Sequence, residues 1–185
     1  SPFWLARFGD VGPASLVFWT RTLQSSGLEA DRLDLFLVDP DIDPDPEAAW
    51  SLTGLDSPGD WEVETIPLDP FAGTGRPVTI RFQSTLARLP DDERTIFLID
   101  DVCAGAIDDE SCLGNLLGDP GFDWDDGSWT EIPADPKIIR LPDDEARSDP
   151  GVARFEGAAP DVTSLWQNIN IDPEPDRPRF YLQDE

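Results

Sequence analysis

The chain has 185 residues, of which 39% are hydrophobic and 10% aromatic, enough apolar material for one large or two small folded domains. Its 39 acidic residues against 13 basic ones give a formal net charge of −26, and a surface of that sign repels nucleic acid and anionic lipid. No apolar run reaches the ~18 residues that a membrane-spanning helix needs, so we expect neither nucleic-acid binding nor membrane insertion.

Short β-rich segments, each bounded by Pro, Gly or Asp, follow one another along the chain. They are Ser15–Arg21, Leu33–Val38, Trp61–Ile66, Val78–Phe82, Thr95–Val102 and Ser164–Ile171. No segment keeps an apolar stripe at helical spacing for three turns, so helix is expected only in a turn or two, with Pro46–Trp50 as the candidate. The pattern predicts an all-β protein, a sandwich of antiparallel sheets.

Cys103 and Cys112 bracket a short acidic loop directly after the fifth of these segments. The chain has no His and no second cysteine pair, so a zinc site of the usual kind is excluded and a disulfide is predicted. Such a bridge would contribute ~2–3 kcal/mol, mostly by restricting the unfolded chain. It would also place the protein in an oxidising compartment, outside the cell or at its surface. Two reduced, partly buried thiols are the alternative.

The succession of segments over residues 14–102 resembles the latter part of the MAM-like and carbohydrate-binding jelly-roll modules of secreted proteins. Those modules run from an "L-x-F-W" strand, matched here by Leu16–Trp19, to a terminal "I-D-D-V" strand, matched by Ile99–Val102. Residues 115–182 resemble the first part of the same family, beginning with its "G-F-[ED]" motif at Gly121–Asp123. The resemblance implies an antiparallel jelly-roll β-sandwich whose parts stand in permuted order.

The permuted order divides the chain in two. Residues 1–114 correspond to the C-terminal part of one module, and residues 115–185 to the N-terminal part of the next module or of the same one. One internal alignment sets Trp4 on Trp166, and a rival with more identities sets Leu5–Phe8 on Val152–Phe155. We prefer the first, because the rival leaves the Leu33 strand without the strand pair that normally precedes it.

The strands that complete each sandwich have three potential sources: the same chain, the next subunit, or covalent neighbours in a tandem array. If they come from the next subunit, repetition of the head-to-tail contact builds a homopolymeric filament. The strand at the subunit boundary would then carry Leu165, Trp166, Ile169 and Ile171.

The family resemblance also implies a structural calcium ion that joins the acid after "G-F" to the acidic pair of the last strand. Carried over to this chain, the ligands are Asp123 with Asp100 or Asp101, and carboxylate oxygens suit calcium. The run Asp39–Glu47 has alternate acids like a calcium loop, but it contains prolines and lacks the glycine of an EF-hand turn. A solvated loop is the favoured interpretation of that run. For the acidity as a whole, adaptation to a salt-rich habitat and ion binding stay open.

Catalysis has little support, because a chain without His has no imidazole acid or base. Carboxylate pairs arise by chance among 39 acids, and the strand signature of jelly-roll glycosidases is absent. We therefore expect a non-catalytic extracellular structural protein, a unit of a filament or tandem array assembled by β-strand complementation. The alternative is a carbohydrate-binding or adhesion module of a larger secreted protein. Its sugar-stacking rings would be those in loop-like contexts, Trp50, Trp124 and Trp129, for which burial in the core is the competing interpretation.

Overall fold

The computed structural model describes residues 14–39, 43–71, 77–87, 89–90, 93–105, 115–118, 121–122, 128–132, 138–140, 146–148, 151–156 and 162–171. The strands in these ranges are β1 Ser15–Gln24, β2 Arg32–Val38, β3 Trp50–Thr53, β4 Glu62–Pro67, β5 Pro77–Thr85, β6 Ile96–Gly105, β7 Thr130–Ile132, β8 Ile138–Arg140, β9 Gly151–Glu156 and β10 Val162–Asn170. One 3-10 turn, Asp69–Phe71, follows β4. In the part of the chain that the structure describes, no helix is long and apolar enough to cross a membrane.

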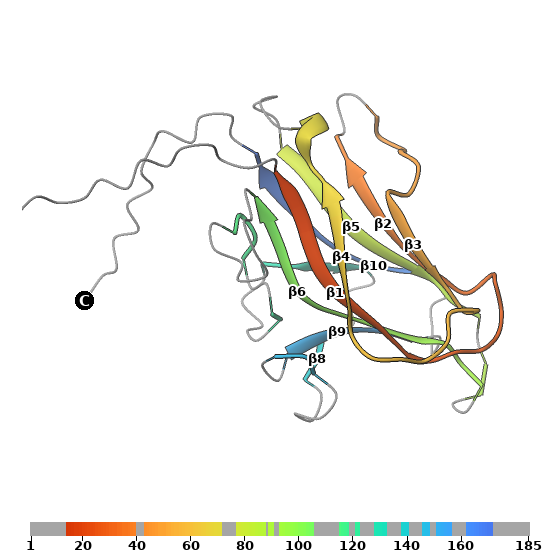
Figure 1. Ribbon diagram of the computed structural model, residues 1–185. Coiled ribbons are helices and arrows are strands. Elements are labelled where there is room, and N and C mark those ends of the chain that lie inside the picture. Colours follow the sequence, from red (N-terminus) through yellow and green to blue (C-terminus); the bar gives the residue numbers. More distant parts are fainter. Residues whose placement is uncertain are drawn as a thin grey trace, which may run out of the picture.

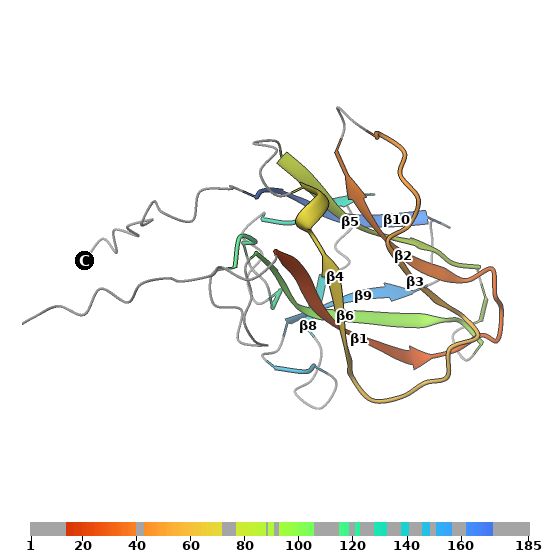
Figure 2. The ribbon, with the colours of Figure 1, turned by 45° about the horizontal axis from the view of Figure 1, so that its top comes forward.

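The strands form two five-stranded antiparallel sheets that face each other (Figures 1 and 2). Sheet A has the order β4-β1-β6-β9-β8, and sheet B has the order β3-β2-β5-β10-β7. Strands at equivalent positions in the two sheets are consecutive in sequence, so the chain repeatedly crosses from one layer to the other. The prediction of an all-β antiparallel sandwich is confirmed.

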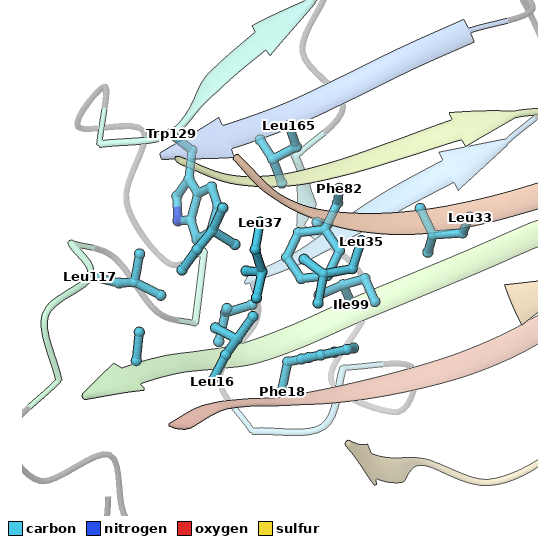
Figure 3. Packing of buried hydrophobic residues seen from close by; sticks show 14 of the residues in the cluster. Leu16, Phe18, Leu33, Leu35, Leu37, Phe82, Ile99, Leu117, Trp129 and Leu165 are labelled. Carbon is cyan, nitrogen blue, oxygen red and sulfur yellow. The ribbon is translucent and has the colours of Figure 1, made fainter. Parts of the chain in front are cut away.

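The core lies between the sheets and is built by the period-two alternation of the strands. In β1, Leu16 and Phe18 are fully buried, while Val17 and Trp19 point to the other side of sheet A. From sheet B, Phe82 meets Phe18 edge to face, with ring centroids 5.2 Å apart. Figure 3 shows these side chains interdigitating with those of Leu35, Ile99 and Leu165 from both layers.

Residues beyond 115 complete both sheets within the same chain. In sheet A, β9 pairs with β6, and in sheet B, β10 pairs with β5 in unbroken register from Val162 opposite Thr85 to Asn170 opposite Pro77. The start of β1 and the end of β10 lie at the same end of the sandwich in both ribbon views (Figures 1 and 2). Of the three sources considered for the completing strands, this structure uses the same chain.

The short helix expected at Pro46–Trp50 is not present, and that prediction is wrong. Residues 46–48 have no regular structure, and Trp50 opens strand β3. The backbone N–H of Ala49 donates to the carbonyl of Leu35 at 2.8 Å, and Trp50 pairs with Leu35 in the ladder. Pairing with β2 therefore overrides the local preference of the two alanines for helix.

Candidate functional site

A bulge in β6 shapes the acidic pair that the sequence singled out. Along the β1–β6 ladder, Val17 pairs with Cys103 but Trp19 pairs with Asp100, so two residues of β6 stand opposite Phe18 alone. The extra residue is absorbed by Asp101, whose φ of 48° is left-handed, a conformation that Asp tolerates better than most residues. The bulge thus directs two consecutive carboxylates to the outer side of sheet A.

The Asp100 carboxylate is completely buried there. Its Oδ1 accepts a hydrogen bond from the backbone N–H of Asp101 at 2.8 Å, and its Oδ2 accepts one from the N–H of Arg147 at 3.1 Å. Burial, followed by the negative charge of Asp101, raises the pKa of Asp100 from its ordinary value of 3.8 to about 7, although these backbone N–H donors oppose the shift. Asp100 therefore changes its charge near neutral pH.

The neighbouring Asp101 anchors the segment 146–148 across the strand. Its carboxylate forms an ion pair with the Arg147 guanidinium and accepts a hydrogen bond from the Ser148 hydroxyl at 2.9 Å. The same guanidinium lies 3.7 Å from the centroid of the Trp19 ring, a cation–π arrangement. We call Trp19, Asp100, Asp101, Arg147 and Ser148 the bulge cluster.

The predicted calcium ligands are brought together only in part. Asp100 and Asp101 are adjacent, but Asp123 lies outside the described residues. Its neighbour Phe122 has a left-handed φ of 55°, and the backbone carbonyl of Phe122 contacts Gly151 so closely that a Cβ at position 151 would clash. Within the described ranges, no group of three His, Cys, Asp or Glu side chains could hold a metal ion. At Asp101, calcium would compete with the Arg147 guanidinium for the same carboxylate.

We expect that calcium, if it binds the bulge cluster, raises the melting temperature in proportion to the logarithm of its concentration, because it binds the folded state only. The Asp101→Asn variant should lose this shift, whereas Asp45→Asn, in an exposed loop, should keep it. Differential scanning fluorimetry in EDTA and in millimolar calcium measures both. Identical melting curves in the two buffers would remove the calcium hypothesis.

The structure contains half of the predicted cysteine pair. Cys103, 3% exposed, is disulfide-bonded. Cys112 lies outside the described residues, so the pairing stays a prediction, which the mass of the unreduced protein after alkylation tests.

The loop tryptophans proposed to stack on sugars do not stand free in solvent. Trp129 is 6% exposed and packs against Phe122, with ring centroids 5.3 Å apart. Trp50 is half-buried and meets Phe18 edge to face at 5.1 Å. Both rings therefore pack on the core, as the interpretation that competes with sugar stacking expects. Trp124 lies outside the described residues. Tertiary packing decides this, because each ring finds an aromatic partner in the core and large aromatic side chains gain most from burial.

The strand assigned to a subunit boundary fills the core of its own chain. Leu165, Ile169 and Ile171 are at most 4% exposed and belong to the main core cluster. Trp166 alternates with them and is half-buried on the outer side of sheet B. The alternation therefore predicts correctly that Leu165, Ile169 and Ile171 face an apolar interior, whereas their place at a subunit boundary stays a prediction.

The run Asp39–Glu47 divides between the interior and solvent. Asp39 is 2% exposed and its carbonyl accepts the N–H of Asp43 at 2.9 Å, whereas Asp43, Asp45 and Glu47 are exposed. Residues 40–42 lie outside the described residues.

Sequence reasoning missed a buried aspartate that joins the β1–β2 loop to the β5–β6 loop. Asp31 is fully buried, and its Oδ2 accepts hydrogen bonds from the hydroxyls of Ser26 at 2.5 Å and Thr95 at 2.7 Å. Its Oδ1 accepts one from the backbone N–H of Ala87 at 2.6 Å. A Cβ at Gly54 would approach the Asp31 Cβ to 2.9 Å, so the site is also closely packed. Its partners lie up to 64 residues away from it in sequence, and no local motif marks them.

The hollow beside β1 and the β3–β4 loop, about 260 Å³ in volume, is lined by three carboxylates, those of Asp56, Asp60 and Glu62, together with Arg21, Leu52 and hydroxyl side chains. Asp56 accepts the Thr53 N–H at 2.6 Å, and Arg21 donates to the Gly59 carbonyl at 2.9 Å. These groups order the loop itself.

Comparisons with protein-family models, curated proteins and solved structures found no match to this chain.

Proposed function

We propose that this chain is a self-contained, non-catalytic extracellular module that binds or adheres, rather than a subunit that must exchange strands. The observation that carries the proposal is the position of β10, which fills its place in sheet B from within the same chain. With Leu165 and Ile169 buried, no strand-sized apolar groove is left at that position for a neighbour to enter.

The outermost strands support the proposal. Sheet A ends at β4 and β8, and sheet B ends at β3 and β7, and none of these four strands exceeds six residues. The longest, β4, carries Glu62 and Glu64 and ends at Pro67. Short edges with charges and proline discourage pairing with another chain. Strand complementation would have to displace a strand that is already paired.

The extracellular assignment rests on the disulfide at Cys103, because disulfides persist in oxidising compartments. The non-catalytic assignment rests on chemistry: the chain has no His, and Asp100, the carboxylate in the described ranges whose pKa is clearly raised, is buried beneath segment 146–148 and not exposed in a cleft. A carboxylate that substrate cannot reach cannot act as acid or base on it.

The solution mass of the purified chain tests the proposal. Light scattering after size exclusion should give the mass of one chain, 20.5 kDa, and negative-stain images should show separate particles. Filaments that disassemble when Leu165 is replaced by Asp, but not when exposed Val162 is, would favour the strand-exchanging filament instead. That second candidate is favoured by one observation, the similarity of the segments around Trp4 and Trp166.

A further inference from the structure

The outer face of sheet B carries a row of aromatic and guanidinium groups across its central strands. Phe36 on β2 pairs with Arg81 on β5, which pairs in turn with Trp166 on β10. Directly paired residues in neighbouring strands project to the same side of a sheet. All three are half-buried, on the side opposite the core residues Leu35, Ile80 and Leu165.

Polar side chains lie on both sides of this row. One flanking row consists of Asp34, Gln83 and Ser164, and the other includes Thr79 and Asn168, whose side chains are joined by a 2.6 Å hydrogen bond. Neither Gln83 nor Ser164 has a side-chain hydrogen bond to another described residue. Hydroxyl and amide groups of this kind both donate and accept, so they can bind a ligand rich in hydroxyls.

The central arginine has hydrogen-bonding capacity to spare. Its guanidinium lies over the Phe36 ring, 4.8 Å from the ring centroid, a cation–π arrangement. Its Nε is buried and has no hydrogen-bond partner among the described residues. Arg81 as a whole is half-buried, so it is the guanidinium N–H groups other than this buried one that can donate to a ligand on the sheet face.

The charge on this face decides the class of ligand. Its described charged residues are Arg32, Arg81 and Asp34, so it is poor in acid although the chain carries −26. Anionic polymers are repelled by the chain as a whole, and cationic ones are attracted instead to the exposed acidic loops at Asp43 and Asp45. Pairing of this face with the same face of a second copy would bring like-charged arginines together, which is unfavourable. A neutral, hydroxyl-rich ligand is neither repelled by the net charge of the chain nor drawn away to the acidic loops.

Spacing narrows the choice to an extended chain. Phe36 and Trp166 are separated by one intervening strand, so at about 4.8 Å between strands their backbones lie ~10 Å apart. Two sugar units of a flat, β-linked polysaccharide can lie over positions at that separation, with their C–H faces on rings and their hydroxyls toward the flanking rows. Ile132 and Val162, 56% and 47% exposed, extend the apolar surface at the margin.

We propose that the outer face of sheet B binds a neutral, extended β-linked polysaccharide along the Phe36–Arg81–Trp166 row. This inference rests on the proposed binding-module function and names its surface and ligand. Trp166 supplies the main stacking ring, because the Phe36 ring already contacts Arg81. Arg81 donates hydrogen bonds to sugar hydroxyls, and Gln83 and Ser164 orient the chain.

Affinity electrophoresis in mixed-linkage β-glucan and in xylan, with depletion assays on cellulose and chitin, tests the proposal. Wild-type protein should bind at least one of the four, and Trp166→Ala should weaken that binding about tenfold or more, as loss of a central aromatic contact does. The Trp166→Phe variant should retain part of the affinity for that polysaccharide, because it keeps an aromatic ring. Trp61→Ala, which removes a half-buried tryptophan on the sheet A side, is the matched control and should bind like wild type. Near-UV circular dichroism establishes that each variant is folded.

Two results overturn the proposal: no binding of wild type to any of the four polymers, or equal binding by folded Trp166→Ala. Stronger retention by the polyanion alginate than by the neutral polymers would contradict the charge argument. If the protein is a monomer that binds none of the four polymers, the polysaccharide proposal is wrong and the binding-module proposal still stands. If the protein forms filaments, the binding-module proposal is itself wrong.

Discussion

The Asp31→Ala variant is expected to lose ~3–5 kcal/mol of unfolding free energy, a large fraction of the stability of a domain this size. The substitution leaves the Ala87 N–H and the hydroxyls of Ser26 and Thr95 without the carboxylate that accepts all three. A buried group left unpaired costs ~1–3 kcal/mol, and although the Thr95 hydroxyl can still donate to the Ser26 hydroxyl at 2.7 Å, the β1–β2 and β5–β6 loops lose their common anchor. Urea unfolding followed by tryptophan fluorescence measures the loss.

Two matched variants separate the network from a general effect of removing charge. Asp31→Asn retains an oxygen for the Ala87 N–H, and the two hydroxyls can reverse their direction, so it should lose clearly less than the alanine variant. Asp56→Ala removes an exposed aspartate that also accepts a backbone N–H, from Thr53, and should cost ~1 kcal/mol or less. If Asp31→Ala and Asp56→Ala lose equal amounts, the buried network does not contribute as described.

The contribution of Asp100 to the free energy of unfolding is expected to fall as the pH rises from about 4 to 7. The pKa of Asp100 is raised to about 7 in the folded protein from 3.8, so the folded state holds a proton that the unfolded state releases first. The stabilisation is complete below pH 4, is lost across this window and stays lost above it. At ~1.4 kcal/mol per pH unit over about three units, the change in unfolding free energy reaches ~4 kcal/mol.

The Asp100→Asn variant isolates this effect from the repulsion among the other acids. Its stability relative to wild type should rise between pH 4 and pH 7, because the amide stays neutral and wild type must ionise a buried group. At pH 4 the variant should be the weaker by ~1 kcal/mol, since the amide nitrogen cannot accept one of the two backbone N–H bonds. Asp101 and Arg147 are the charged groups beside it, and neither is altered. A constant difference between the two proteins from pH 4 to pH 8 would show that Asp100 does not titrate in this window.

The sequence alone determined the class of fold and the position of most long strands. Period-two alternation in segments such as Leu33–Val38 and Val78–Phe82 is a local property of the chain, and both became strands of sheet B. It failed at β3, because Trp50–Thr53 is a strand only by virtue of pairing with β2. The adjacent acids Asp100 and Asp101 could also be selected from sequence, but their contacts with Arg147 could not.

Tertiary structure alone decided which side of each strand faces the core. Alternation makes Phe18 and Trp19, or Leu165 and Trp166, equally good core residues in sequence, and only packing of the second sheet buries Phe18 and Leu165. The same packing buried Trp129 and left Trp166 on an outer face. The Asp31 network was likewise invisible, because hydrogen bonds between loops far apart in sequence depend on distances that exist only after the two sheets have come together.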